Sequence, residues 1–356
     1  MPGGEVLGIL SDGTHIEVLE QSGEWLKARY SGQDGFVAAA YVTFDAAEPA
    51  AESGEVRTSD ECRFEGNRAV APDGTVFATR RGVGVMNIGT TRLATFIKAR
   101  AGDLFPPSRI KPSLVSVMQA VSENEGLLEA INTYDNAFLS FGVFQWTVGA
   151  GDGRGELAAL LALLKTEDNA AFDRCFGRFG LDVAELNAPA GVVPTGYLSL
   201  AGKPLRTAAE KEQLRTLDWA YRFWLAGQNT AVRRAEVLHA AGRIDTFYGI
   251  ERAALGGRAL NALVNSEYGV ALLLDQHVNR PAHVVTTVAG ALARLPDAIA
   301  DKPPPDWTTA DEEALLAEYV AVRAGTGMTA SDLRARRTRD AVASGACSAE
   351  RGSFKT

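Results

Sequence analysis

The chain has 356 residues, a formal net charge of −8 at pH 7 and a pI near 5.2. An acidic surface repels the phosphates of nucleic acids, so the charge argues against a DNA- or RNA-binding protein. The apolar fraction of 46% is ordinary for a chain that buries a core, which excludes a disordered protein and, at this length, indicates two or three domains.

Membrane insertion and cofactor binding are not expected. No run approaches the ~18 uninterrupted apolar residues of a spanning helix, and the first residues, Met-Pro-Gly-Gly-Glu, lack the basic and apolar regions of a secretory signal. Residues 82–89 are rich in glycine but depart from the GxGxxG spacing of nucleotide-binding loops. The cysteines and histidines show neither zinc-binding spacing nor a disulfide framework: Cys62, Cys175, Cys347, His15, His239, His277 and His283.

Residues 1–44 are predicted to form a small all-β domain. Short alternating apolar runs are separated by Asp-Gly and Ser-Gly turns, which is typical of a small barrel. The pattern resembles bacterial SH3 domains through Gly13-Thr14, Val18, Gly23, Trp25, Tyr30, Gly35-Phe36-Val37 and Tyr41. The resemblance implies a domain that attaches an enzyme to cell-wall peptide or glycan through Trp25, Tyr30 and Tyr41. At alternating strand positions the same aromatic side chains also suit a barrel core.

The rest of the chain is expected to be mainly helical. Residues 45–56 are small, acidic and contain proline, as linkers do. Residues 57–300 are expected to form a catalytic domain, entered through a hairpin near residues 72–79, and residues 301–356 a helical extension. Apolar spacing predicts helices over residues 111–121, 153–165, 210–226, 230–241, 258–278, 309–324 and 329–343. Residues 344–356 are predicted to be a frayed tail.

The residues best suited to chemistry lie between 122 and 146. Glu123-Asn124-Glu125-Gly126 follows a predicted helix, and Gly126 suits a left-handed helix end. Asn132 to Asp135 has the composition of a turn, and residues 139–145 alternate like a strand with a glycine where a ligand can approach. This order of helix, loop and strand predicts carboxylates on opposite sides of a cleft, the pair that cleavage of a glycosidic bond requires.

The same segment resembles the lysozyme superfamily. Phage-type lysozymes show Glu-Gly at a helix end, then Tyr-Asp, then a hydroxyl residue two positions before a glycine. This chain has Glu125-Gly126, Tyr134-Asp135, Ser140 and Gly142, with serine in the place of threonine. Goose-type lysozymes and lytic transglycosylases share Gly-x-x-Gln, here Gly142 to Gln145, and chitosanases share Glu-Asn, here Glu123-Asn124. The resemblance implies a lysozyme-like (α+β) domain with a short β-hairpin at its active site.

Catalytic roles follow from the resemblance. Glu125 would protonate the glycosidic oxygen, while Asp135 with Ser140 would hold a water on the opposite face of the sugar. A separation of ~6.5–9.5 Å between the carboxylates would favour inversion, and one near ~5 Å a covalent intermediate; without a held water, transglycosylation is expected. The chitosanase comparison makes Glu123 the alternative acid, and residues two apart on a helix point ~200° apart, so one of the two faces the cleft.

Five further residues are candidate substrate contacts. Asn132 and Tyr134 would orient the carboxylates, and Gln145 and Trp146 would bind sugar by a hydrogen bond and ring stacking, although Trp146 equally suits a core. Arg280, at the end of a long apolar segment, would pair with an acid of the site or interact with the helix C-terminus.

The predicted function is hydrolysis of the peptidoglycan glycan strand without a cofactor, with cell-wall binding by the SH3-like domain. The alternatives are a chitosanase-like hydrolase and a non-catalytic wall-binding protein of a phage or secretion apparatus. The expected partner is peptidoglycan or a related aminosugar polymer. In the absence of a secretory signal, the protein is expected to reach the wall after lysis, through a holin, or by specialised secretion or phage delivery.

Overall fold

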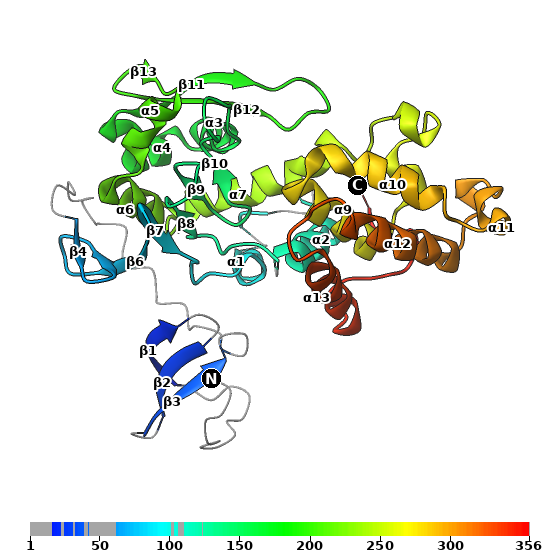
Figure 1. Cartoon of the computed structure of the whole chain (residues 1–356), viewed down its shortest axis with the longest axis horizontal. Helices are drawn as coiled ribbons and strands as arrows, with labels where there is room; N and C mark the ends of the chain where they lie inside the picture. The colour runs from blue at the N-terminus through cyan, green and yellow to red at the C-terminus, as the bar shows by residue number, and fades with distance from the viewer. Residues whose placement is uncertain are drawn as a thin grey trace. The chain divides into compact units, whose positions relative to one another are not determined.

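The computed structural model describes residues 16–22, 25–30, 33–38, 42, 62–100, 103–105, 110–122 and 124–355. The chain divides into two compact units, Met1–Gly54 and Glu55–Thr356, and the division falls inside the segment predicted to be a linker. Small antiparallel sheets come first and a mainly helical part follows, so the prediction is confirmed at this coarse level (Figure 1). Residues 301–356 belong to the same compact unit as the segment predicted to be catalytic.

The first unit contains a three-stranded antiparallel sheet in the order β1 (Glu17–Ser22), β2 (Trp25–Tyr30) and β3 (Gln33–Ala38). Leu26 and Ala28 of β2 are buried, as alternation along a strand requires. Trp25 and Tyr30 are 39% and 47% exposed, so they do not form a core. Tyr41, the third aromatic residue of the SH3-like pattern, lies outside the described residues.

The second unit opens with a β-meander that extends the predicted hairpin. Its seven strands lie in the order β10-β9-β8-β7-β6-β5-β4. The turn between β5 and β6 contains Gly74, whose φ of +88° an L side chain rarely adopts. The strand bounds are β4 (Arg63–Glu65), β5 (Arg68–Val70), β6 (Val76–Arg81), β7 (Gly84–Asn87), β8 (Ile131–Asn132), β9 (Ser140–Phe141) and β10 (Trp146–Thr147).

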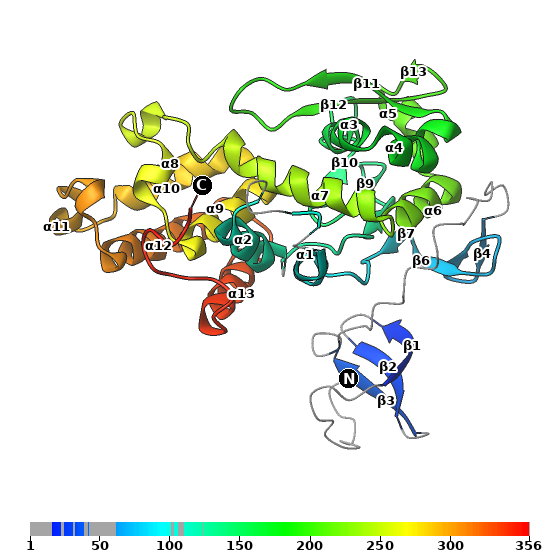
Figure 2. The same ribbon diagram turned by 180° about the vertical axis from the view of Figure 1, so that it is seen from behind.

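Helices make up most of the rest of this unit, and Figure 2 shows α7 running from the sheet region toward the later helices. The α-helices are α1 (Leu93–Arg100), α2 (Pro112–Ser122), α3 (Leu157–Glu167), α4 (Asn169–Cys175), α5 (Ala208–Lys211), α6 (Leu217–Ala226), α7 (Thr230–Gly242), α8 (Leu260–Leu263), α9 (Glu267–Asn279), α10 (Val284–Leu292), α11 (Asp297–Ala300), α12 (Thr309–Ala324) and α13 (Ser331–Ala343). Short 3₁₀ helices are η2 (Gly177–Phe179), η3 (Glu212–Leu214), η4 (Arg243–Thr246), η5 (Ala253–Leu255), η6 (Pro281–His283) and η7 (Pro304–Asp306). A second three-stranded sheet, which the sequence did not predict, comprises β11 (Leu181–Asn187), β12 (Thr195–Leu200) and β13 (Lys203–Pro204). Within the described part of the chain, no helix has the length and apolar composition needed to cross a membrane.

Three local predictions are corrected by the structure. The helix predicted over residues 258–278 is divided, because Ser266 caps the start of α9 and Glu312 of α12 accepts hydrogen bonds from the N–H groups of Asn265 and Ser266. The helix predicted over residues 210–226 is likewise divided by η3 and by the cap of Thr216 on α6. Gly126 is absent from the glycines with positive φ among the described residues, since α2 already ends at Ser122.

The C-terminal segment is packed rather than frayed. The Phe354 ring lies 5.4 Å from the ring of Tyr248 in an edge-on contact, and its N–H donates to the carbonyl of Asn265. Lys355 N donates to the hydroxyl of Ser113 at the start of α2. Helix α13 packs against both α2 and α9, so the C-terminal helices contribute directly to the region around Glu125.

Candidate active site

Glu125 lies in the loop after α2 and is held by side chains from two distant helices. Its Oε1 accepts a hydrogen bond from Nδ2 of Asn279 on α9 at 3.1 Å and forms an ion pair with Nη2 of Arg334 on α13. The Glu125 side chain is 11% exposed. Because both contacts are made to Oε1, a proton on the neutral acid is carried by Oε2, the oxygen that can donate to a substrate.

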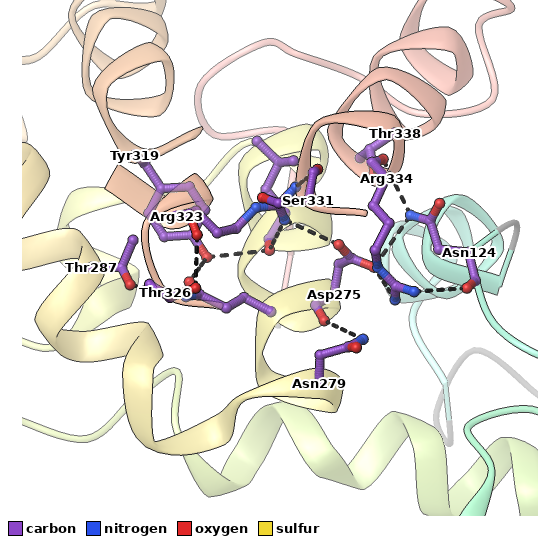
Figure 3. A network of polar contacts seen from close by, with 12 residues as sticks. Asn124, Asp275, Asn279, Thr287, Tyr319, Arg323, Thr326, Ser331, Arg334 and Thr338 are labelled. Atoms are coloured by element: carbon purple, nitrogen blue, oxygen red, sulfur yellow. Dashed lines mark hydrogen bonds and ion pairs between the residues drawn. The ribbon is translucent and has the colours of Figure 1, made fainter. Parts of the chain in front are cut away.

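Asp275 of α9 organises the cations behind Glu125. This carboxylate has no exposed surface, and its two oxygens accept from different arginines: Oδ2 from Nη1 of Arg323 at 3.0 Å, Oδ1 from Nη2 of Arg334 at 2.6 Å. Asn124 adds a hydrogen bond to Asp275 Oδ1, and its carbonyl accepts from Arg334. Figure 3 shows this network spanning α9, α12, α13 and the loop after α2.

The surroundings of Glu125 favour its neutral form. Burial raises the pKa of Glu125 from its ordinary 4.5 to about 7, against the lowering effect of the ion pair and hydrogen bond with Arg334. The negative charge of Asp275 adds to the rise. Arg334 therefore orients the carboxyl group without forcing it to ionise, because much of its positive charge is balanced by Asp275. A carboxyl group that keeps its proton near neutral pH has the property that a general acid needs.

Asp135, Asn132 and Ser140 are brought together by the hairpin of β8 and β9. Asn132 Nδ2 donates to Asp135 Oδ2 at 2.7 Å, and the other oxygen of Asp135 accepts from the N–H of Ala137. Ser140 is the direct cross-strand partner of Asn132, so the two side chains lie on one face of the sheet. Ser140 is buried. The three predicted residues thus form one group, in which Asn132 holds Asp135.

The turn between β9 and β10 lies next to the backbone that follows Glu125. A Cβ at Gly126 would come within 3.3 Å of both Gln145 Nε2 and the carbonyl oxygen of Gly142. Gln145 Nε2 donates to that carbonyl at 2.9 Å, so this side chain closes its own turn. Phe138 and Gln145 are two of the four non-glycine residues with positive φ in the described part of the chain. Such strain tends to gather at functional sites.

The remaining predicted residues occupy different places. Tyr134 is 41% exposed and available to a ligand, but Trp146 is 2% exposed and packs against Phe144 and His239 in the core, which excludes the predicted ring stacking on sugar. Arg280 donates to the carbonyl of Gly327, so the predicted pairing of an arginine with the acid is made by Arg334 instead. Glu123 lies outside the described residues.

Sequence reasoning missed most of the residues that hold Glu125. The signal that could have identified Asp275 and Asn279 is their position, because they are polar residues at the end of a long apolar segment. Arg334 and Arg323 gave no such signal. Arg334 is 209 residues from Glu125 in the chain and lies in a helix with several other arginines, which local patterns cannot tell apart.

The described residues include no group of three or more His, Cys, Asp or Glu side chains that could hold a metal ion. Comparisons of the chain with protein-family models, with curated proteins and with solved structures give no match.

Proposed function

We propose that this protein is a glycoside hydrolase that cleaves the glycan strand of peptidoglycan, with Glu125 as the general acid. The observation that carries the proposal is the environment of Glu125, a nearly buried carboxyl group anchored through one oxygen by Arg334 and Asn279, with its pKa raised to about 7. Such a group is protonated in mildly acidic solution and about half protonated at neutral pH. It can transfer that proton to a glycosidic oxygen as the bond breaks.

Asp135 supplies the second carboxyl group of the mechanism. Its two oxygens accept hydrogen bonds from Asn132 Nδ2 and from the N–H of Ala137, which fix the orientation of the carboxyl group. As a base, Asp135 would take a proton from water on the opposite face of the sugar, and Ser140 on the same sheet face would help to position that water. The product anomer is expected to be inverted if the two carboxyl groups stand ~6.5–9.5 Å apart.

Peptidoglycan is favoured as substrate by the exposed sheet face of the first unit. Trp25 and Phe36 are 39% and 53% exposed. Trp25 is paired with Ala38 and Lys27 with Phe36, so the two aromatic rings are diagonal neighbours on one face of β2 and β3. Exposed aromatic rings next to hydrogen-bonding groups are the usual means by which proteins hold sugars and peptides. We propose that this face belongs to an SH3-like barrel that binds the cell wall.

The test compares the wild-type full chain with Glu125→Gln on purified cell walls, by turbidity and by release of reducing sugar. Loss of the acid proton is expected to lower the rate about 10²- to 10⁴-fold. Glu251→Gln, an exposed glutamate outside the site, is the matched control and should cleave at the wild-type rate. Clearing by Glu125→Gln equal to that of the wild type would refute the assignment, and loss of activity in Glu123→Gln alone would transfer the role to Glu123.

The same variants separate the other functions. Parallel reactions on chitosan identify a chitosanase if that polymer is cleaved and cell walls are not. A wild-type chain that cleaves neither polymer but sediments with cell walls would be a wall-binding protein without hydrolase activity. Asp135→Asn should bind walls as the wild type does and cleave them far more slowly, because substrate binding by the first unit does not involve that carboxylate.

A further inference from the structure

A second buried carboxyl group lies beneath the hairpin, outside the network of Glu125. Glu236 of α7 has no exposed surface, and its Oε2 accepts a hydrogen bond from the N–H of Val143 at 2.9 Å. Its Oε1 has no hydrogen-bond partner among the described residues. Val143 lies in the turn that joins β9, which begins with Ser140, to β10. The hydrogen bond therefore ties α7 to the hairpin of the proposed site.

The fit between this carboxyl group and the turn is close. Gly142 has a φ of +78°, and a Cβ added there would lie 2.4 Å from Glu236 Oε2 and 2.8 Å from the ring of Trp146. The backbone can approach the carboxyl group only because residue 142 is glycine. The turn is closed on its other side by Gln145, whose N–H and side-chain amide both donate to the Gly142 carbonyl.

The charges around Glu236 are already balanced by other partners. Arg233, one turn earlier on α7, donates to Glu129 Oε1 at 2.6 Å, and Glu129 also accepts from the backbone N–H groups of Thr90 and Thr91. The other ionisable side chains of α7 that the structure pairs, Arg234 and His239, contact Glu167 and Glu156. Glu236 is thus buried beside a carboxylate, without a cation of its own.

A neutral Glu236 fits these surroundings and an ionised one does not. Burying an unpaired carboxylate costs far more than burying a neutral carboxyl group with one hydrogen bond. Burial raises the pKa of Glu236 well above its ordinary 4.5, and the nearby Glu129 adds to the rise, against the lowering effects of the Val143 N–H and of Arg233. Ionisation would place negative charge on a carboxyl group whose Oε1 has no hydrogen-bond partner among the described residues.

We propose that Glu236 is a positioning residue of this hydrolase, which in its neutral form holds the β9–β10 turn in place. The proposal rests on the proposed function for its catalytic consequence. Glu236 does not reach the sugar; it acts through the Val143 N–H on the strand that carries Ser140, whose cross-strand partner Asn132 holds Asp135. Because the neutral form of Glu236 holds the turn, a glutamine at this position should perform the same role.

The test uses Glu236→Gln, Glu236→Ala and, as an exposed control, Glu251→Gln in the full chain. Glutamine keeps an oxygen for the Val143 N–H and cannot ionise, so at pH 6 its kcat and KM should lie within about twofold of wild type. Alanine removes the acceptor and leaves space under the turn. Its kcat should fall on the order of 10²-fold with a smaller change in KM, because misplacement of the hairpin affects the reacting groups more than wall binding.

Two readouts do not depend on activity. Hydrogen exchange of the peptide spanning residues 139–148 should be faster in Glu236→Ala and unchanged in Glu236→Gln. The wild type loses stability as the pH rises above 4.5, because the unfolded chain releases the Glu236 proton and the folded chain keeps it. The excess Tm of Glu236→Gln over wild type should therefore widen by roughly 5 °C between pH 5 and pH 7.

The outcomes separate the two proposals. A Tm difference that stays constant with pH would mean that Glu236 is ionised in the fold, and wild-type exchange or wild-type kcat in Glu236→Ala would mean that it does not hold the turn. Each of these results overturns the inference. If the wild type cleaves no glycan, the proposed function and the catalytic role of Glu236 fail together, while exchange and Tm still show whether a neutral Glu236 holds the turn.

Discussion

Replacing Asp275 with asparagine is the sharpest perturbation of the Glu125 network. Asparagine has nearly the same shape as aspartate and can still accept hydrogen bonds, so the change removes charge with little loss of volume. Asp275 has no exposed surface and forms ion pairs with both Arg323, at 3.0 Å, and Arg334, at 2.6 Å. The variant would leave these two guanidinium groups close together without the carboxylate that separates them.

The expected loss of stability is large. Removing one partner of a buried ion pair costs about 3–5 kcal/mol, because the remaining charge stays desolvated. Arg323 is fully buried and loses its carboxylate partner, whereas Arg334 keeps its contact with Glu125. We therefore expect the free energy of unfolding to fall by about 4 kcal/mol in total. In a unit of this size, that loss should lower Tm by roughly 8 °C.

The same variant should change the ionisation of Glu125. Asp275 raises the pKa of Glu125, and its neutralisation also leaves the charge of Arg334 unbalanced, so both effects lower the pKa of Glu125 in the variant. A general acid with a lower pKa loses its proton at lower pH. The decline of activity on the alkaline side should therefore begin at a lower pH in Asp275→Asn than in the wild type.

Thermal unfolding followed by circular dichroism, together with pH–rate profiles on cell walls, measures both effects. Asp340→Asn, an exposed aspartate on the same helix as Arg334, is the control and should match the wild type in both assays. A Tm within about 2 °C of wild type would show that the arginines do not depend on Asp275 for their charge balance. Movement of the alkaline decline to higher pH would refute the electrostatic account of Glu125.

The pH–rate profile of the wild type should decline about tenfold per pH unit above pH 7 as Glu125, with its pKa of about 7, loses the proton that it donates; a flat profile to pH 9 would contradict its role as acid. Lys211→Met should lower the free energy of unfolding, measured in urea, by about 3 kcal/mol. The reason is that the buried ammonium group donates hydrogen bonds to the carbonyls of Gly149, Gly151 and Gly153. An unchanged urea midpoint would contradict this prediction. Gly142→Ala should cost at least about 2 kcal/mol because of its positive φ and the collision with Glu236. Gly74→Ala, at a similar φ but in open space, should cost only about 1 kcal/mol, and equal losses would show that packing under the hairpin does not matter.

Local signals predicted several elements well. The helix over residues 309–324 is confirmed as α12, where Thr308 and Asp311 form a capping box at its start and Gly325 follows its end. The helix over residues 230–241 is confirmed within one residue as α7, capped by Asn229. These boundaries were predictable because caps and apolar spacing act within one turn of the backbone, and so do the turn residues that bring Asn132 and Asp135 together.

Burial was the main property that local patterns did not decide. Trp146 of β10 and Ser140 of β9 point to opposite faces of the sheet, in positions that either an exposed or a core residue could occupy, yet both are buried. Trp146 packs against His239 of α7. Residues 344–355 have the composition of a tail, yet Phe354 and Lys355 find partners near Asn265 and Ser113. Such contacts join segments far apart in the chain, so no window of sequence contains both members.

The sequence by itself determined that helix α2 ends just before Glu125, and it determined the hairpin and the order of carboxyl, hydroxyl and amide groups from Glu125 to Gln145, because each of these depends on neighbouring residues. The left-handed helix end predicted at Gly126 was wrong. The tertiary structure decided which residues surround the carboxyl groups of Glu125 and Glu236 and so set the pKa of each group. Arg334 and Asp275 reach Glu125 from helices distant in the chain, and Glu236 reaches the hairpin from α7. The pKa of a carboxyl group depends on burial and on charges a few ångströms away, and only folding brings those charges together.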